Sequence, residues 1–168
     1  MGIVAALLFL AFATLSIAGA AGLILFRHPL NCAVSFIITL ISLAGLYALL
    51  SAKVLFAFQI IVYAGAIMSL ILFIIMFINV RDEDLPDESN RIFLMAGGCV
   101  FLVPIAWILL KAIFALPYVS TAIVGDGFGG IHQFGMMLFT DWILPFEVVS
   151  ALLLVALVGG VVLAKRRI

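Results

Sequence analysis

Long uncharged stretches alternate with short charged or proline-containing breaks along the chain. One stretch runs from Met1 to Phe26, and another holds the 27 residues from Val54 to Val80. At 1.5 Å per residue, a helix over the second stretch is roughly 40 Å long, whereas the hydrocarbon core of a bilayer is about 30 Å thick. The pattern therefore predicts helices that cross a membrane.

Five segments have the hydropathy expected of a transmembrane helix. They cover residues 2–26, 30–50, 54–79, 92–116 and 142–164. Pro29 disfavours helical backbone at His28, so the chain is expected to reverse sharply between the first two segments. We expect an all-α integral membrane protein with five transmembrane helices, in which residues 1–168 form a single membrane domain.

The composition agrees with this class. Hydrophobic residues make up 68% of the chain and charged residues 10%, and the mean hydropathy is +1.47. A soluble domain is typically about 45–50% apolar. The eight basic and eight acidic residues balance, which leaves no basic surface for nucleic acid. The uncharged run from Met1 to Phe26 lacks the basic start of a signal peptide and is longer than a signal-peptide core. We therefore expect a retained first helix.

The lysines and arginines predict the orientation, because cytoplasmic loops are enriched in them. If the C-terminal residues 165–167 lie in the cytoplasm, the first and third loops lie there too, and Lys53 and Lys111 fall toward the outside. The six basic residues inside are then Arg27, Arg81, Arg91, Lys165, Arg166 and Arg167. The expected topology has the N-terminus outside and the C-terminus in the cytoplasm.

Two of the predicted loops are long. The third, residues 81–91, holds five of the eight acidic residues and is expected to be solvated. The fourth, residues 117–141, is rich in glycine and is expected to lie along the surface or against a neighbour. Its segment Gly125–Gly130 matches the glycine spacing of a dinucleotide-binding loop, but that spacing works only between a strand and a helix. We interpret it as a loop with glycines at positive φ.

Cys32 and Cys99 each stand alone, without the spacing of a metal or redox site. We expect both to be small buried hydrophobic residues, and no metal or cofactor is expected on this chain.

Four polar residues fall on one face of the second predicted helix. They are Asn31, Ser35, Thr39 and Ser42. Such a stripe either lines a hydrated path or forms hydrogen bonds between helices, and the second interpretation is favoured.

Glu147 is the one carboxylate inside a predicted span and follows Pro145 by two residues. An ionised acid at the bilayer centre costs roughly 2.5–3.5 kcal/mol, and less near the edge. Glu147 is therefore either an acid at the interface or helix N-terminus, or a member of a proton path.

The middle of the third predicted helix is more polar and smaller than an anchor requires. Gln59 and Tyr63 are neighbours at i, i+4 on a regular helix, and Ala66 completes that face. Gly65 has no Cβ, and a mid-helix glycine beside a buried tyrosine suits a π-bulge or a rotation point. Close packing against another subunit is the alternative, and both interpretations are compatible.

Three stretches together resemble a known family. Gln59–Met68, with the sequence QIIVYAGAIM, and the following Leu72–Met76 resemble the third helix of subunit J of NADH-quinone oxidoreductase, which is respiratory complex I. The mitochondrial counterpart is NADH dehydrogenase subunit 6. Arg27–Ala33 resembles the turn after the first helix of that family, and Pro145–Gly159 its last helix.

The resemblance implies a non-catalytic subunit in the membrane arm of a proton-pumping complex. Subunits A, H and K and the antiporter-like subunits are the implied neighbours, in a bacterial cytoplasmic (inner) membrane. NADH, FMN, iron–sulfur clusters and quinone are expected in other subunits. The third helix of the family is thought to switch between regular and π-bulged forms, and that role carries over onto Tyr63 and Gly65.

One departure from the family pattern matters. Some members have glutamate where this chain has Gln59, so this helix carries one titratable group fewer. A small stand-alone transporter and a purely structural membrane scaffold are the alternative functions. The sequence leaves open the electron donor of the complex and its quinone.

Overall fold

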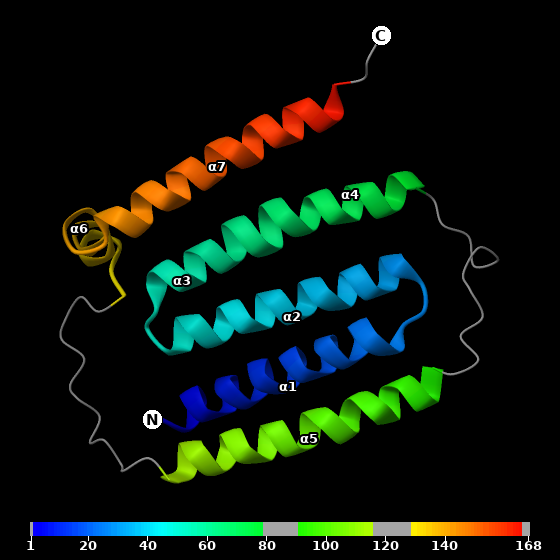
Figure 1. The fold of residues 1–168 in the computed structure, drawn as a ribbon. Coiled ribbons are helices and arrows are strands. Elements are labelled where there is room, and N and C mark those ends of the chain that lie inside the picture. Colours follow the sequence, from blue (N-terminus) through cyan, green and yellow to red (C-terminus); the bar gives the residue numbers. More distant parts are fainter. Residues whose placement is uncertain (1, 79–90, 116–128, 166–168) are drawn as a thin grey trace.

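The computed structural model describes residues 2–78, 91–115 and 129–165, and every regular element in these ranges is a helix (Figure 1). The elements are α1 (Ile3–Leu25), α2 (Pro29–Leu49), α3 (Lys53–Phe58), η1 (Gln59–Ile67), α4 (Met68–Ile78), α5 (Arg91–Ala115), α6 (Ile131–Thr140) and α7 (Ile143–Ala164). The segments α3, η1 and α4 follow one another without a break, so Lys53–Ile78 forms one continuous rod.

Among the described residues, four helices are long and apolar enough to cross a membrane: α1, α2, the rod Lys53–Ile78 and α7. Their bounds lie close to the predicted spans, because the charged and proline-containing breaks end each helix. Helix α5 covers the fourth predicted span with 25 residues, and its apolar part runs over Val100–Ala115. Its crossing of the membrane, and so the count of five spans, remains a prediction. The acidic loop at residues 81–90 lies outside the described residues.

Helices α1 and α2 pack closely because two glycines of α1 face polar residues of α2. A Cβ added to Gly19 would lie 2.9 Å from the carbonyl oxygen of Ser35 and 3.0 Å from the amide nitrogen of Thr39. A Cβ on Gly22 would collide with the Ser35 hydroxyl. Small residues of this kind let two backbones approach inside a membrane, where lipid supplies no hydrophobic drive between helices.

The polar stripe of α2 is largely buried, and two of its hydroxyls donate hydrogen bonds to the backbone of α2 itself. Ser35, Thr39 and Ser42 are buried, whereas Asn31 is exposed. The Thr39 hydroxyl donates to the Ser35 carbonyl at 3.1 Å, and the Ser42 hydroxyl donates to the Ile38 carbonyl at 2.7 Å. Hydrogen bonds between helices were expected for these side chains. For Thr39 and Ser42 that prediction is wrong, because each hydroxyl donates to a carbonyl one turn earlier in its own helix.

The turn before α2 is capped by a residue that sequence reasoning passed over. Nδ1 of His28 accepts a hydrogen bond from the Leu30 amide at 3.3 Å, and Pro29 occupies the first helical position. Proline is favoured there because its missing N–H has no intrahelical partner to lose. The chain reverses at this point, as the proline predicted.

The turn after α2 has the hydrogen bonds of a Schellman motif. The Ser51 amide donates to the Ala48 carbonyl at 3.1 Å, and the Ala52 amide donates to the Tyr47 carbonyl at 3.0 Å. Ser51 has φ of +61°, a left-handed conformation that glycine usually takes at this position. The short connection between the second and third spans is thus a defined turn.

Helix α6 lies within the fourth predicted loop, where the sequence analysis predicted no helix. Ten residues of that loop, Ile131–Thr140, are helical. Gly129, at φ of +69°, precedes the helix, and its carbonyl accepts a hydrogen bond from the Val54 amide at 3.2 Å. The start of α6 is thereby fixed to the start of α3. Figure 1 shows α6 end-on, while α3 and α7 lie across the view, so α6 runs roughly perpendicular to the spans.

The glycine contact between α1 and α2 can be tested by adding volume. We expect Gly19→Val to destabilise the pair by about 1–3 kcal/mol, because its branched side chain meets backbone atoms of α2 that cannot swing away. The measurement is the amount of the chain retained in membranes, by immunoblot. Ala20→Val is the control, since Ala20 is the exposed neighbour of Gly19. Equal retention of the two variants would contradict the prediction.

The predicted orientation can be tested at two exposed residues near opposite ends of the spans. His132→Cys and Lys165→Cys are made singly in a background without Cys32 and Cys99, and intact cells receive an impermeant thiol reagent. We expect labelling at position 132 and protection at position 165, because the basic residues place the C-terminus inside. After detergent treatment both positions should label. The opposite pattern on intact cells would overturn the orientation.

Candidate functional site

The centre of the rod is wound as a π-helix over nine residues, Gln59–Ile67. At its end, the Met68 amide reaches the Tyr63 carbonyl, five residues back, as well as the Gly65 carbonyl. Most π-helical segments are single-turn bulges, and they are frequent at functional sites. The sequence indicated a π-bulge at the mid-helix glycine, and the structure has a longer π segment at that place.

The π winding decides which side chains face α2. Val54, Gln59 and Met68 are buried, and Ala64 packs against the cluster that contains Met68. The interval of five residues from Gln59 to Ala64 lies within the π segment, whereas Val54 belongs to the regular helix α3. The face predicted from a regular helix is therefore wrong in part, because Ala66 is exposed.

Gln59 and Tyr63 border the same cavity of about 380 Å³ between α2 and the rod. Its lining residues are Phe36, Leu40, Leu43, Tyr47, Leu55, Phe58, Gln59 and Tyr63. Gln59 is only 7% exposed, whereas Tyr63, expected to be buried, is 51% exposed. The Gln59 amide and the phenols of Tyr47 and Tyr63 thus line an otherwise apolar cavity. All three groups can both donate and accept hydrogen bonds.

Tyr47 was missed by the sequence analysis. It lies near the end of α2, and the spacing within one helix cannot show that it meets residues of the next span. A tyrosine inside a predicted span was the available signal, because a phenol in lipid needs a hydrogen-bond partner.

The π winding leaves little room for a side chain at Gly65. A Cβ added there would lie 3.0 Å from the carbonyl oxygen of Ile60, five residues earlier. The contact is with backbone of the same helix, so it cannot be relieved by moving a side chain. A larger residue at this position therefore disfavours the π form specifically.

Glu147 is placed apart from this cavity. It is the fifth residue of α7, outside the first turn, and it is exposed. The cap residue of α7 is Trp142, and no side chain caps the helix. The structure therefore gives no support to Glu147 as a cap, and it does not bring Glu147 together with Gln59 or Tyr63.

Three features of the sequence bear on metal and nucleotide chemistry: the potential metal ligands, the cysteines and the glycine-rich segment. No group of three metal-ligating side chains occurs within residues 2–78, 91–115 and 129–165. Cys32 is half-buried, and its thiol donates to the Phe26 carbonyl at 3.3 Å. Cys99 lies in α5, but its side chain is outside the described set. Of the glycine-rich segment, only Gly129 and Gly130 are described, and they lead into α6.

Comparison with known proteins decides the family. A family model described as NADH-ubiquinone/plastoquinone oxidoreductase chain 6 matches residues 19–163, which include α2, the whole rod and all but the last residue of α7. The chain belongs to this family. The resemblance drawn from Gln59–Met68 and from the last helix is thereby confirmed.

Individual relatives agree. The NAD(P)H-quinone oxidoreductase chain 6 of Leptolyngbya boryana is 38% identical over 159 residues, which cover 94% of this chain and 78% of the relative. The chain 6 protein of Nostoc is 41% identical over 128 residues, 75% of this chain and 62% of the relative. The chloroplastic subunit 6 of Mesostigma viride is 36% identical over 153 residues, 90% of this chain and 79% of the relative.

The position of Glu147 leads to a prediction for its role. We expect Glu147→Gln to leave the assembled complex and its proton-to-electron ratio unchanged, because Glu147 neither caps α7 nor reaches the cavity of Gln59. The ratio is measured by proton uptake in inverted vesicles during quinone reduction. Glu147→Asp serves as the charge-conserving control. A fall in the ratio for Gln but not for Asp, with normal assembly, would place Glu147 in a proton path.

Proposed function

We propose that this chain is a non-catalytic, membrane-arm subunit of a proton-translocating NADH:quinone oxidoreductase, and that its rod couples quinone reduction to proton translocation. The observation that carries the proposal is the π-helix Gln59–Ile67 at the centre of a membrane span, beside a cavity that holds a buried amide. Membership of the chain 6 family supports the assignment to the complex. The coupling role rests on the winding of the rod around Gln59–Ile67.

Conversion between regular and π winding within Gln59–Ile67 would turn the start of the rod relative to its end. Val54 and Met68 are 14 positions apart, and at 100° per residue they lie within about 40° of each other around a regular helix. In the observed π form both are already buried against the rest of the chain. The burial of Val54 and Met68 is therefore compatible with either winding.

Gln59 behaves differently. It begins the π segment, and α3 before it is regular α-helix. Gln59 and Met68 are both buried in the π form, yet in a regular helix they would lie about 180° apart around the axis. The conversion would carry the Gln59 amide out of the cavity beside α2 and toward a neighbouring subunit. Because packed interfaces favour discrete arrangements, such an element acts as a two-state switch. A change in the cavity would open or close a hydrated path.

The remaining assignments follow from the family. Subunits A, H and K and the antiporter-like subunits are the proposed neighbours. NADH, FMN, iron–sulfur clusters and quinone would be bound by other subunits, and this chain would bind none of them. The complex would lie in a bacterial cytoplasmic membrane, with the N-terminus of this chain outside.

Substitution of Gly65 tests the coupling role. We expect Gly65→Val to favour the regular winding, because a Cβ at this position crowds the Ile60 carbonyl in the π form. Quinone-linked activity and proton pumping should fall together by about tenfold, the ratio that corresponds to roughly 1.4 kcal/mol. NADH oxidation with an artificial acceptor, measured on the same membranes, should stay normal. Tyr63→Phe should have a milder effect, since it removes one hydroxyl and keeps the ring.

Ser69→Val is the matched control, because Ser69 is an exposed residue of α4 just beyond the π segment. It adds a branched side chain to the same rod without touching Ile60. If quinone reduction and pumping were equal in Gly65→Val and Ser69→Val, the rod would be a packing element and the chain a scaffold. Assembly is verified separately by blue native electrophoresis.

A further inference from the structure

Helix α6 is attached to the start of the rod by two contacts. The Val54 amide of α3 donates a hydrogen bond to the Gly129 carbonyl at 3.2 Å. One turn further along α3, the ring of Phe58 meets Phe134 of α6 edge-on, with ring centroids 6.1 Å apart. A ring pair of this geometry adds attraction beyond the area that it buries. The rod is therefore attached to α6 just before the π segment begins.

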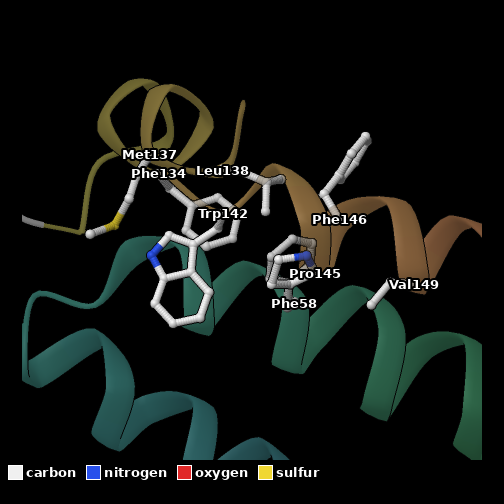
Figure 2. Close-up of a pocket in the computed structure, with 8 residues that line it drawn as sticks. All are labelled: Phe58, Phe134, Met137, Leu138, Trp142, Pro145, Phe146 and Val149. Carbon is white, nitrogen blue, oxygen red and sulfur yellow. The ribbon is translucent and has the colours of Figure 1, made fainter. Parts of the chain in front are cut away.

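The contact between the two rings is bordered by open space. Figure 2 shows Phe58 and Phe134 among the residues that line an apolar cavity of about 380 Å³, whose walls come from α3, α6 and α7. The Phe58 side chain is 48% exposed and the Phe134 side chain is 41% exposed. The attachment of α6 to the rod is therefore small enough to be released while both helices stay intact.

Phe58 connects this attachment to the candidate functional site. It is the last residue of α3, and the next residue, Gln59, begins the π segment. Phe58 also lines the cavity between α2 and the rod that Gln59 borders. Because adjacent residues of one helix turn together, a conversion that carries Gln59 out of that cavity also moves Phe58 away from Phe134.

Helix α6 is not free to follow the rod, because its far end is attached to α7. Phe139 of α6 meets Phe146 of α7, with ring centroids 4.9 Å apart. The second half of the rod is held as well, since Met68 is only 1% exposed and belongs to the cluster that contains Ala33 and Leu40. The turn therefore falls on the start of the rod, and the contacts with α6 must break when it occurs.

We propose that α6 is a latch that stabilises the π form of the rod, with Phe134 as its positioning residue. This inference rests on the proposed coupling role of the rod. Phe134 meets Phe58 in the π form and loses that contact in the regular form, so its ring lowers the free energy of the π form alone. Release of Phe58 from α6 accompanies each conversion, and the strength of the contact sets the balance between the two windings.

The test is cryo-electron microscopy of the purified complex during turnover with NADH and quinone, with particles sorted by the winding of residues 59–67. Phe134→Ala should raise the ratio of regular to π particles about fivefold, because it deletes the ring that favours the π form. Phe134→Tyr should keep the parent ratio, since it retains the ring. Ile131→Ala is the control, because Ile131 is a large side chain of α6 that is 80% exposed, and it should keep the parent ratio too.

A double-mutant cycle shows whether the two rings act as one contact. Phe58→Leu and Phe134→Leu should each raise the ratio, and the double variant should raise it no further than either single one. Additive shifts, an unchanged ratio in Phe134→Ala, or α6 still seated on α3 in particles with regular winding would overturn the latch, while the switch itself would stand. If every variant, including Gly65→Val, gave only π particles, both the switch and the latch would be refuted.

Discussion

Inside a bilayer, the peptide groups of a span must find their hydrogen bonds within the span itself, and this constraint governs the whole rod Lys53–Ile78. Lipid offers no substitute partner, so a break in the helix would leave unsatisfied polar groups at a cost of several kcal/mol each. A π-helix avoids that cost because each amide still has an acceptor, now five residues back. The rod can therefore carry an altered winding at its centre and continue into α4 without interruption.

The same constraint explains why the helices pack as they do. Ser35 and Thr39 lie against α1 and Ser42 is also buried, yet the hydroxyls of Thr39 and Ser42 donate to carbonyls of their own helix. The close approach comes from Gly19 and Gly22 of α1, where a side chain would collide with α2. Shape complementarity thus fixes this pair, and polar side chains fit into it without depending on a partner helix.

The sequence located the long helices well, because hydropathy and breaks such as Pro29 act locally. It also located the π segment, since Gly65 in an otherwise aliphatic span is a local signal. The sequence did not predict the buried face of the rod, because the prediction assumed 3.6 residues per turn. The observed winding instead places Gln59 and Ala64 inward. The sequence did not predict α6 either, since ten residues after a glycine-rich stretch are too short for a span and carry no capping side chain.

Gln59 is the residue at which these constraints meet. An ionised carboxylate at mid-span costs roughly 2.5–3.5 kcal/mol, and a switch that moved one would have to pair it in both positions. An amide does not ionise near neutral pH, yet it can donate and accept hydrogen bonds. Its transfer between the cavity beside α2 and a neighbouring subunit would need no charge partner in either form. In the proposed mechanism the rod therefore changes the connectivity of the path, while the protons themselves are carried by water and by groups elsewhere in the complex.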